Sequence, residues 1–422
     1  MRPAFRFDRT YDGANFFLRF AAKFYLRRRC MRDVVILSAT RTPIGAFQGA
    51  LASVSAPRLG AVAVGAAVAQ AGIAPADVTD VLLGNVLQAG LGQAPARQAA
   101  IYGGLPDSVR AVTIHKVCGS GLQAVMQGSH ALQVGAAEVV VAGGMENMSA
   151  APYLLPKARE GFRLGNQTIL DSVIHDGLWD PYGQIHMGKC AEQCVQKYGF
   201  TRQQQDDYAA ESFRRANAAQ VDGRLAQEIT PVEVAEPKGG TKRIERDEGP
   251  AKVNYDRLPT LRPAFDPQGT ITAANASSIN DAAAALVLTT AETARTRGLR
   301  PLARLVSFGS HAQEPIWFTT APIAAAQKAL ARAGWGVGDV DLWEINEAFA
   351  VVALAFIQEL HLAPDRVNVR GGAIALGHPI GCSGARILVT LLAALRERGA
   401  RRGVAAICIG GGEGLAVCIE LL

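Results

Sequence analysis

The spacing of apolar residues between positions 111 and 146 predicts a strand, a glycine-rich turn, a helix and a second strand. Residues 111–114 form a short apolar run that suits a strand, and apolar positions between 122 and 132 recur at helical spacing. Residues 139–142 are apolar throughout, which is typical of a strand buried on both faces. This order of elements is a βαβ unit.

Cys118 lies in the turn of this unit, where the predicted helix begins. The unpaired N–H groups and the dipole of a helix N-terminus favour a thiolate over a thiol. The glycines beside it would let a substrate carbonyl approach the backbone closely. A lone cysteine at a tight turn is more often a small packing residue, so a chemical role needs support from elsewhere in the chain.

The same order of features returns in the second half of the chain, which indicates an internal duplication. The corresponding landmarks are Ala56-Pro57 and Ala321-Pro322, Asn85 and Asn346, Gly121 and Gly384, and Glu146 and Glu413. Two such halves predict an α/β fold with two mixed, mostly parallel sheets covered by helices. Pseudo-twofold packing would bring the two glycine turns to a shared crevice, where open α/β sheets place ligands.

The repeat also predicts the domain organisation. An N-terminal half spans residues 31–148 and 277–300, and a C-terminal half spans 301–422. Residues 149–276 interrupt the repeat with turn-rich polar segments, a predicted helix at 201–220 and a charged stretch. An insertion of this length is expected to be a subdomain or lid that carries specificity.

Composition indicates a globular protein with a large core. The 422 residues are 49% hydrophobic and 19% charged, and no apolar run is long enough to span a bilayer. The net charge of +6 originates in residues 1–30, which hold eight basic and two acidic side chains. The remainder is close to neutral, so neither nucleic-acid nor membrane binding is expected. Residues 1–30 are either a targeting-like extension or upstream of a translation start at Met31, which we favour; in both cases they lie outside the fold.

The seven cysteines show no paired spacing that suggests a disulfide framework. Cys190 and Cys194 stand four residues apart, but no second Cys or His pair at zinc-ligand spacing accompanies them. We therefore expect no metal site. Reduced thiols fit a cytoplasmic compartment best.

Three further residues could take part in chemistry with Cys118. His378 lies between glycines and beside a proline in the turn of the second half, which keeps it accessible. Asn346, between two Glu residues after an apolar strand, could hold a water or a carbonyl oxygen. Cys408 precedes a glycine run whose N–H groups can point at an anion. Each signal is weak alone, since a lone Asn is usually a turn residue and Cys408 suits a core position.

Together these segments resemble the thiolase family. Four motifs carry the resemblance, in the order and spacing typical of that family: Val117-Cys118-Gly119-Ser120-Gly121, Asn346-Glu347-Ala348-Phe349, Gly377-His378-Pro379 and Cys408-Ile409-Gly410-Gly411-Gly412. The resemblance covers residues 31–422. It implies a five-layer α/β/α/β/α arrangement of the duplicated halves, with residues 149–276 as a loop domain for coenzyme A (CoA) binding and oligomerisation.

The resemblance also implies roles for the candidate residues. Cys118 would be the nucleophile that carries the acyl group as a thioester, and His378 would take its proton. The ordinary pKa of imidazole suits that task at neutral pH. Cys408 would be the acid/base of the C–C bond step. His378 and a water on Asn346 would stabilise the enolate, and the N–H groups of Cys118 and Gly410 would bind the oxyanion of the tetrahedral intermediate.

For CoA, the resemblance points to the loop domain and its exit. Residues expected along the pantetheine arm and the acyl end are His186, Met187, Ser277, Leu178, Phe265, Ala273 and Phe349. Lys252 and Arg257 fall near the nucleotide phosphates in this family, although they could equally be ordinary surface charges. A small pocket at Met187 and Phe349 favours acetyl and acetoacetyl groups.

The resemblance implies an acetyl-CoA C-acetyltransferase, with CoA as substrate and product, no cofactor, a role in lipid metabolism and a homodimeric or homotetrameric assembly. A 3-ketoacyl-CoA thiolase of broader chain length in fatty-acid or aromatic degradation is the alternative. A ketosynthase-like enzyme would need a second His in place of Asn346. A binding-only relative would be expected to lack Cys118, His378 or Cys408. One departure from the usual motif is His115, which could act as a rival base.

Overall fold

The computed structural model describes residues 32–422, so the extension predicted at 1–30 lies outside the described part. Its main feature is one ten-stranded sheet. The strands are β1 (Val34–Arg41), β2 (Gly45–Ala46), β3 (Asp80–Gly84), β4 (Arg110–Ile114), β5 (Val139–Asn147), β12 (Asn280–Thr290), β13 (Ala303–Ala312), β14 (Leu342–Ile345), β15 (Arg402–Ile409) and β16 (Glu413–Leu421).

The strand order repeats itself, which confirms the predicted duplication. In the N-terminal half the order is β4-β3-β5-β12-β1, and in the C-terminal half it is β14-β15-β16-β13. A single parallel bridge between Trp343 and Val367 stands where the second half would have its counterpart of β4. In each half, one strand, β12 or β16, runs against all the others. The sheets are therefore mixed and mostly parallel, as expected from the sequence.

The two predicted sheets are joined along one edge, which the sequence did not indicate. Val34–Ile36 of β1 pair with Ala303–Leu305 of β13, antiparallel, and join the two halves into one sheet. After an irregularity between Ile36 and Ser38, β1 continues beside β12 alone. The joint has a physical cause, because the pseudo-twofold relation brings the two equivalent edge strands side by side and pairing satisfies backbone groups that would otherwise be exposed.

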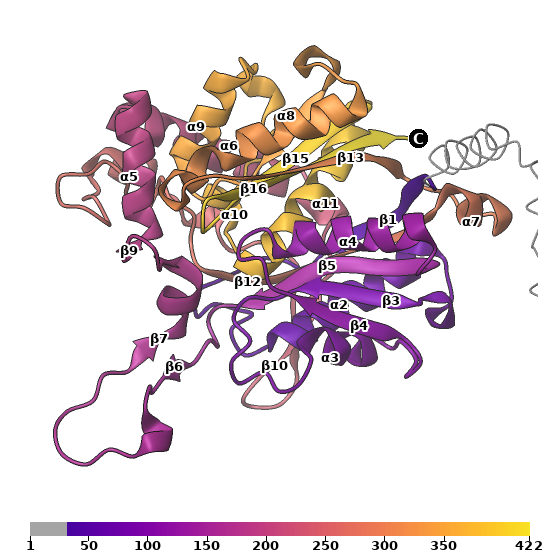
Figure 1. The fold of residues 1–422 in the computed structure, drawn as a ribbon, viewed down its shortest axis with the longest axis horizontal. Coiled ribbons are helices and arrows are strands. Elements are labelled where there is room, and N and C mark those ends of the chain that lie inside the picture. Colours follow the sequence, from indigo (N-terminus) through magenta and orange to yellow (C-terminus); the bar gives the residue numbers. More distant parts are fainter. Residues whose placement is uncertain (1–31) are drawn as a thin grey trace, which may run out of the picture.

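Helices complete five layers in the predicted order (Figure 1). The helices of the two halves are α2 (Ala56–Ala71), α3 (Pro95–Tyr102), α4 (Ser120–Val134), α7 (Ala291–Thr296), α8 (Ala321–Ala333), α9 (Ala350–Glu359), α10 (Ala373–Leu376) and α11 (Ile380–Arg398). Short 3-10 turns accompany them at η1 (Pro75–Asp77), η7 (Pro315–Thr320), η8 (Val337–Asp339) and η9 (Pro364–Arg366). Helices α2 and α3 cover one outer face, and α8 and α9 cover the other.

The central layer consists of α4 and α11, which pack against each other between the two half-sheets. Glycines permit this close crossing. A Cβ on Gly121 would lie 2.8 Å from the backbone N of Ala385, and one on Gly384 would collide with the backbone N of Leu122. The two glycine turns of the repeat therefore meet at the centre of the molecule.

The inserted segment consists of short elements around two longer helices. These are β6 (Tyr153–Leu154), η2 (Ala158–Glu160), β7 (Leu170–Asp171), η3 (Val173–Leu178), β8 (Trp179–Asp180), β9 (Ile185–His186), α5 (Met187–Tyr198), α6 (Arg202–Val221), η4 (Leu225–Gln227), β10 (Val232–Ala235), β11 (Thr241–Ile244), η5 (Pro250–Lys252) and η6 (Tyr255–Thr260). Helix α6 matches the helix predicted at 201–220. It begins with a capping box, in which Thr201 and Gln204 each accept a hydrogen bond from the backbone N–H of the other.

Buried ion pairs attach this segment to both halves. Arg41 of β1 contacts Glu228 and Asp247 of the insertion, each at 2.7 Å. Glu228 also accepts a hydrogen bond from Arg370 of the C-terminal half at 3.1 Å. All four side chains are almost fully buried. Within the described residues, no helix is long and apolar enough to cross a membrane.

Candidate active site

The backbone around Cys118 is strained. Val117 has a φ of +44°, a conformation that costs a β-branched residue energy and that occurs most often at functional sites. Hydrogen bonds hold the turn in place: the Ser120 N–H donates to the Val117 carbonyl at 3.1 Å, and the Ser120 hydroxyl donates to the same carbonyl at 2.7 Å. Helix α4 begins at Ser120, so Cys118 precedes its first turn rather than lying within it.

The ionisation of Cys118 differs from the sequence-based expectation of a thiolate. Burial raises the pKa of the thiol to about 11. Hydrogen bonding to the backbone N–H of Gly410 lowers the pKa, but burial and the nearby Glu146 outweigh that effect. Cys118 is therefore a neutral thiol at rest and needs a base to become a nucleophile.

His378 lies just before α11 and is buried. Its backbone N–H donates to Asn280 Oδ1 at 3.0 Å, and its Nδ1 lies 2.6 Å from the hydroxyl of Ser383. Since the Ser383 hydroxyl donates to the Pro379 carbonyl at 2.9 Å, we assign the proton on Nδ1 to a bond with Ser383. This tautomer leaves Nε2 unprotonated and able to accept a proton.

The pKa of His378 is lower than the ordinary value on which the sequence-based expectation relied. Burial, followed by the positive charge of Arg386, lowers it to about 3. The imidazole is therefore neutral in the resting protein. His378 and Cys118 line the same cavity. A neutral imidazole can take up the proton of a neutral thiol there only as the sulfur bonds to a partner, such as a substrate carbonyl carbon.

Asn346 and Cys408 lie at neighbouring strand ends. Asn346 directly follows β14, and its N–H donates to the Ala406 carbonyl of β15 at 2.9 Å. Its amide Nδ2 lies 3.4 and 3.5 Å from the two ring nitrogens of His378. Cys408, near the end of β15, is fully buried. Burial raises its pKa well above the ordinary range, and a negative charge on Cys118 would raise it further. The two thiols are thus close enough to influence each other.

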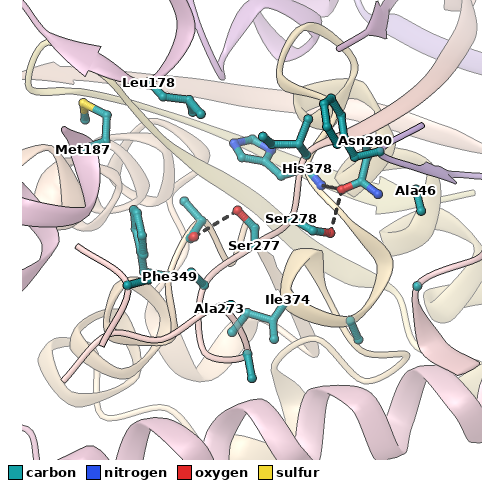
Figure 2. Close-up of a pocket in the computed structure, with 18 of the residues that line it drawn as sticks. Ala46, Leu178, Met187, Ala273, Ser277, Ser278, Asn280, Phe349, Ile374 and His378 are labelled. Carbon is teal, nitrogen blue, oxygen red and sulfur yellow. Dashed lines mark hydrogen bonds between the residues drawn. The ribbon is translucent and has the colours of Figure 1, made fainter. Parts of the chain in front are cut away.

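A single cavity of about 770 Å³ connects these groups with the inserted segment. Cys118, His378 and Gly410 line it, and Asn346 and Cys408 border its lining residues: Asn346 lies 3.4 Å from His378, and Cys408 belongs to one buried cluster with Met187 and Phe349. All nine residues expected to contact CoA also line it: His186, Met187, Ser277, Leu178, Phe265, Ala273, Phe349, Lys252 and Arg257. Figure 2 shows Leu178, Met187 and Phe349 around the space that His378 borders.

Aromatic rings build much of the cavity wall. His186 stacks on Phe265 with ring centroids 4.7 Å apart, and Phe349 meets Phe265 edge-on at 5.9 Å. Gly188 makes this possible, because a Cβ there would collide with the Phe265 ring. The Ser277 hydroxyl donates to the Ala348 carbonyl at 3.0 Å, so its oxygen remains free to accept an N–H from a ligand (Figure 2).

Family models decide the relationship that the motifs suggested. The thiolase N-terminal domain matches residues 34–292, and the thiolase C-terminal domain matches residues 299–421. This chain belongs to the thiolase family. The thiolase fold and the acyltransferase class predicted from the sequence are thereby confirmed.

Individual relatives cover nearly all of this thiolase. Acetyl-CoA acetyltransferase 2 of Arabidopsis thaliana is 52% identical over 93% of this chain and 98% of its own length. An acetyl-CoA acetyltransferase of Cupriavidus necator is 51% identical over 92% of this chain and 100% of its own. The Acat5 thiolase of Ascaris suum, solved in complex with coenzyme A, superposes with a TM-score of 0.88, is 46% identical, and covers 93% of this chain and 100% of its own. The Bacillus anthracis acetyl-CoA acetyltransferase has a TM-score of 0.91 and 42% identity, covering 93% and 99%.

His115, the rival base, lies outside the cavity of this thiolase. It is exposed, and its Nδ1 accepts the Val117 N–H at 3.3 Å. The repeat explains its presence, because His115 stands five residues before Ser120, as His378 stands five residues before Ser383. His115 is the counterpart of His378 in the other half.

Sequence reasoning missed several residues of the site. Asn280 and Ser383 hold His378 from two different elements, and Phe318, Ile380 and Met148 add to the cavity lining. The repeat carried a signal for Ser383, since it aligns with Ser120, whose hydroxyl also binds the turn before its helix. Residues 32–422 contain no group of three or more His, Cys, Asp or Glu side chains that could hold a metal ion.

Proposed function

We propose that this thiolase is an acetyl-CoA C-acetyltransferase, which joins two acetyl-CoA molecules reversibly into acetoacetyl-CoA and CoA. The observation that carries the proposal is the cavity that combines Cys118, His378 and the Gly410 N–H with a mostly apolar wall. The names of the relatives agree with this activity. CoA is a substrate and a product, and the chemistry requires neither a metal nor a cofactor.

In the cleavage direction, the reaction begins with Cys118. His378 Nε2 takes the thiol proton as the sulfur attacks the ketone carbon of acetoacetyl-CoA. The N–H groups of Gly410 and Cys118 bind the resulting oxyanion. Collapse of this intermediate breaks the C–C bond, which leaves an acetyl group on Cys118 and an acetyl-CoA enolate. A water held by Asn346, together with His378, stabilises the enolate oxygen.

Cys408 completes both halves of the reaction. Its thiol donates a proton to the enolate carbon, and acetyl-CoA departs. The Cys408 thiolate then takes the proton of the incoming CoA thiol, whose sulfur attacks the acetyl group on Cys118. Cys118 leaves as a thiolate and recovers its proton from His378. All three groups thus return to the neutral state in which burial holds them, and condensation is the same sequence reversed.

The cavity wall supports a CoA arm that enters past the inserted segment. Ser277 would accept a hydrogen bond from a pantetheine amide, while Phe265, Ala273 and Leu178 provide apolar contact. Lys252 and Arg257 would meet the phosphates. The Lys252 side chain is 59% exposed, and its ion pair with Glu248 is long, at 4.0 Å. An exposed pair of this length is weak, so the charge of Lys252 remains accessible to an anion.

We also propose that the protein assembles as a homo-oligomer, either a dimer or a tetramer. The hairpin of β6 and β7 projects from the body of the molecule (Figure 1). It displays apolar side chains that a second copy could cover: Tyr153, Leu155, Phe162, Leu164 and Ile169. Sedimentation equilibrium would test this assembly, and a monomer at micromolar concentration would contradict it. A cytoplasmic location and a place in lipid metabolism also remain proposals.

The test of function is a steady-state assay of thiolysis and condensation on protein that begins at Met31. Acetoacetyl-CoA should be cleaved with a higher kcat/KM than an eight-carbon 3-ketoacyl-CoA, because Met187 and Phe349 restrict the acyl end. A clear preference for the longer substrate would instead establish the broader-chain thiolase. No turnover of either substrate would refute the proposed function.

A further inference from the structure

A fully buried arginine contacts the amide of Asn346. Arg386 Nη2 donates to Asn346 Oδ1 at 3.4 Å, and Arg386 Nη1 donates to Glu344 Oε1 at 2.9 Å. Neither Arg386 nor Glu344 lines the cavity, and the reaction steps above use neither of them. Within residues 32–422, Arg386 Nε has no hydrogen-bond partner, so the two terminal nitrogens make all of its hydrogen bonds.

The local sequence explains how these side chains meet. Glu344 and Asn346 are two residues apart at the end of β14, and residues at this spacing point to the same side of a strand. Ser383 and Arg386 are three residues apart on α11, which places them on one face of the helix. That face therefore supplies a partner for His378 and a partner for Asn346, and α11 packs against β14.

The contact determines which end of the amide faces His378. A guanidinium group has only donors, so it can accept nothing from the Asn346 N–H2 group. With Oδ1 toward Arg386, Nδ2 faces the ring of His378. The opposite orientation would place two sets of N–H donors against each other in a buried space, where an unpaired donor is costly.

We propose that Arg386 is a positioning residue, which holds the Asn346 amide with its N–H2 group toward His378 and thereby maintains the enolate-stabilising site. The inference rests on the proposed thiolase function. Arg386 does not line the cavity, and it acts on the enolate-stabilising site through the orientation of Asn346, while its charge, which Arg386→Lys retains, lowers the pKa of His378.

The test compares Arg386→Lys with the wild type in acetoacetyl-CoA thiolysis. Lysine retains the charge but cannot contact Glu344 and Asn346 with a planar fork. A hydrogen bond to a charged group is typically worth enough to change a rate about 10- to 100-fold, so kcat should fall by about that factor. KM should stay within about twofold, because Arg386 does not line the cavity.

A double-mutant cycle separates positioning from general damage. In the Asn346→Ala background, Arg386→Lys should have almost no further effect on kcat, since the group through which it acts is absent. Arg370→Lys is the matched control, because Arg370 is also fully buried and pairs with Glu228 and Glu397, away from the cavity. It should leave kcat within about threefold of the wild type even where thermal stability falls.

Asn346→Asp keeps the inference testable should Arg386→Lys fold poorly. Aspartate retains an oxygen for Arg386 but offers no N–H2 group to the other side, so kcat should fall as far as in Asn346→Ala. An unchanged kcat in Arg386→Lys, an equal loss in both backgrounds, or full activity of Asn346→Asp would each overturn the inference. A wild-type enzyme without thiolysis activity would refute the proposed function instead, which keeps the two failures distinct.

Discussion

The ionisation of Cys118 gives the sharpest quantitative prediction. A thiol with a pKa of about 11 is ionised to about one part in 10⁴ at pH 7 and about one part in 10² at pH 9. Because only the thiolate is alkylated, the rate at which iodoacetamide modifies Cys118 in the free enzyme should rise about tenfold per pH unit across this range. A raised pKa predicts a rise that continues beyond pH 9 rather than one that levels off.

The neutral state of His378 is the reason for this slope. An imidazolium beside Cys118 would lower the pKa of the thiol, but burial and Arg386 hold the pKa of His378 near 3. Mass spectrometry of the peptide that contains Cys118 would follow its alkylation separately from the other thiols. His378→Asn is the control, and it should leave the slope unchanged. A plateau below about pH 7.5 that disappears in His378→Asn would reveal a thiolate–imidazolium pair and refute this reasoning.

Three further predictions concern the other groups of the site. The pKa of His378 is lower in the folded protein than in the unfolded chain, so below about pH 6.5 the unfolded chain binds more protons and the wild type loses stability as the pH falls. The free energy of unfolding of the wild type, relative to that of His378→Asn, should be constant above pH 6.5 and should fall by about 1.4 kcal/mol per pH unit from about pH 6 to pH 4. Parallel pH dependences of the two free energies would contradict this prediction. Met187→Ala should raise kcat/KM for a six-carbon 3-ketoacyl-CoA relative to acetoacetyl-CoA by about tenfold, and an unchanged ratio would show that another residue limits the acyl end. Cys408→Ala should still form acetyl-enzyme on Cys118 from acetyl-CoA while losing C–C bond turnover, and normal thiolysis by this variant would remove Cys408 from the mechanism.

The duplication could be predicted from the sequence because corresponding residues recur in the same order in both halves of the chain. Landmarks such as Asn85 and Asn346 follow equivalent strands, and the structure repeats the strand order around them. The pairing of Val34–Ile36 with β13 could not be predicted in this way, since a short antiparallel contact between edge strands produces no periodic pattern in the sequence. The sequence therefore predicted both half-sheets without their joint.

Candidate residues could be found from motifs, but their electrostatics could not. The position of Cys118 at a helix start indicated a lowered pKa and a thiolate, whereas burial in the folded protein raises the pKa and keeps the thiol neutral. Burial and the charge of Arg386 also lower the pKa of His378, although Arg386 is not part of the motif that contains His378. Desolvation depends on everything packed around a group, and no short stretch of sequence specifies that.

The measurement that tests the central claim most directly is peptide mapping of the enzyme quenched after incubation with acetoacetyl-CoA, with and without added CoA. The account predicts one acetyl group on the Cys118 peptide, removed when CoA is added, and none in Cys118→Ala. An acetyl group carried by a different residue, or rapid thiolysis by Cys118→Ala, would contradict it.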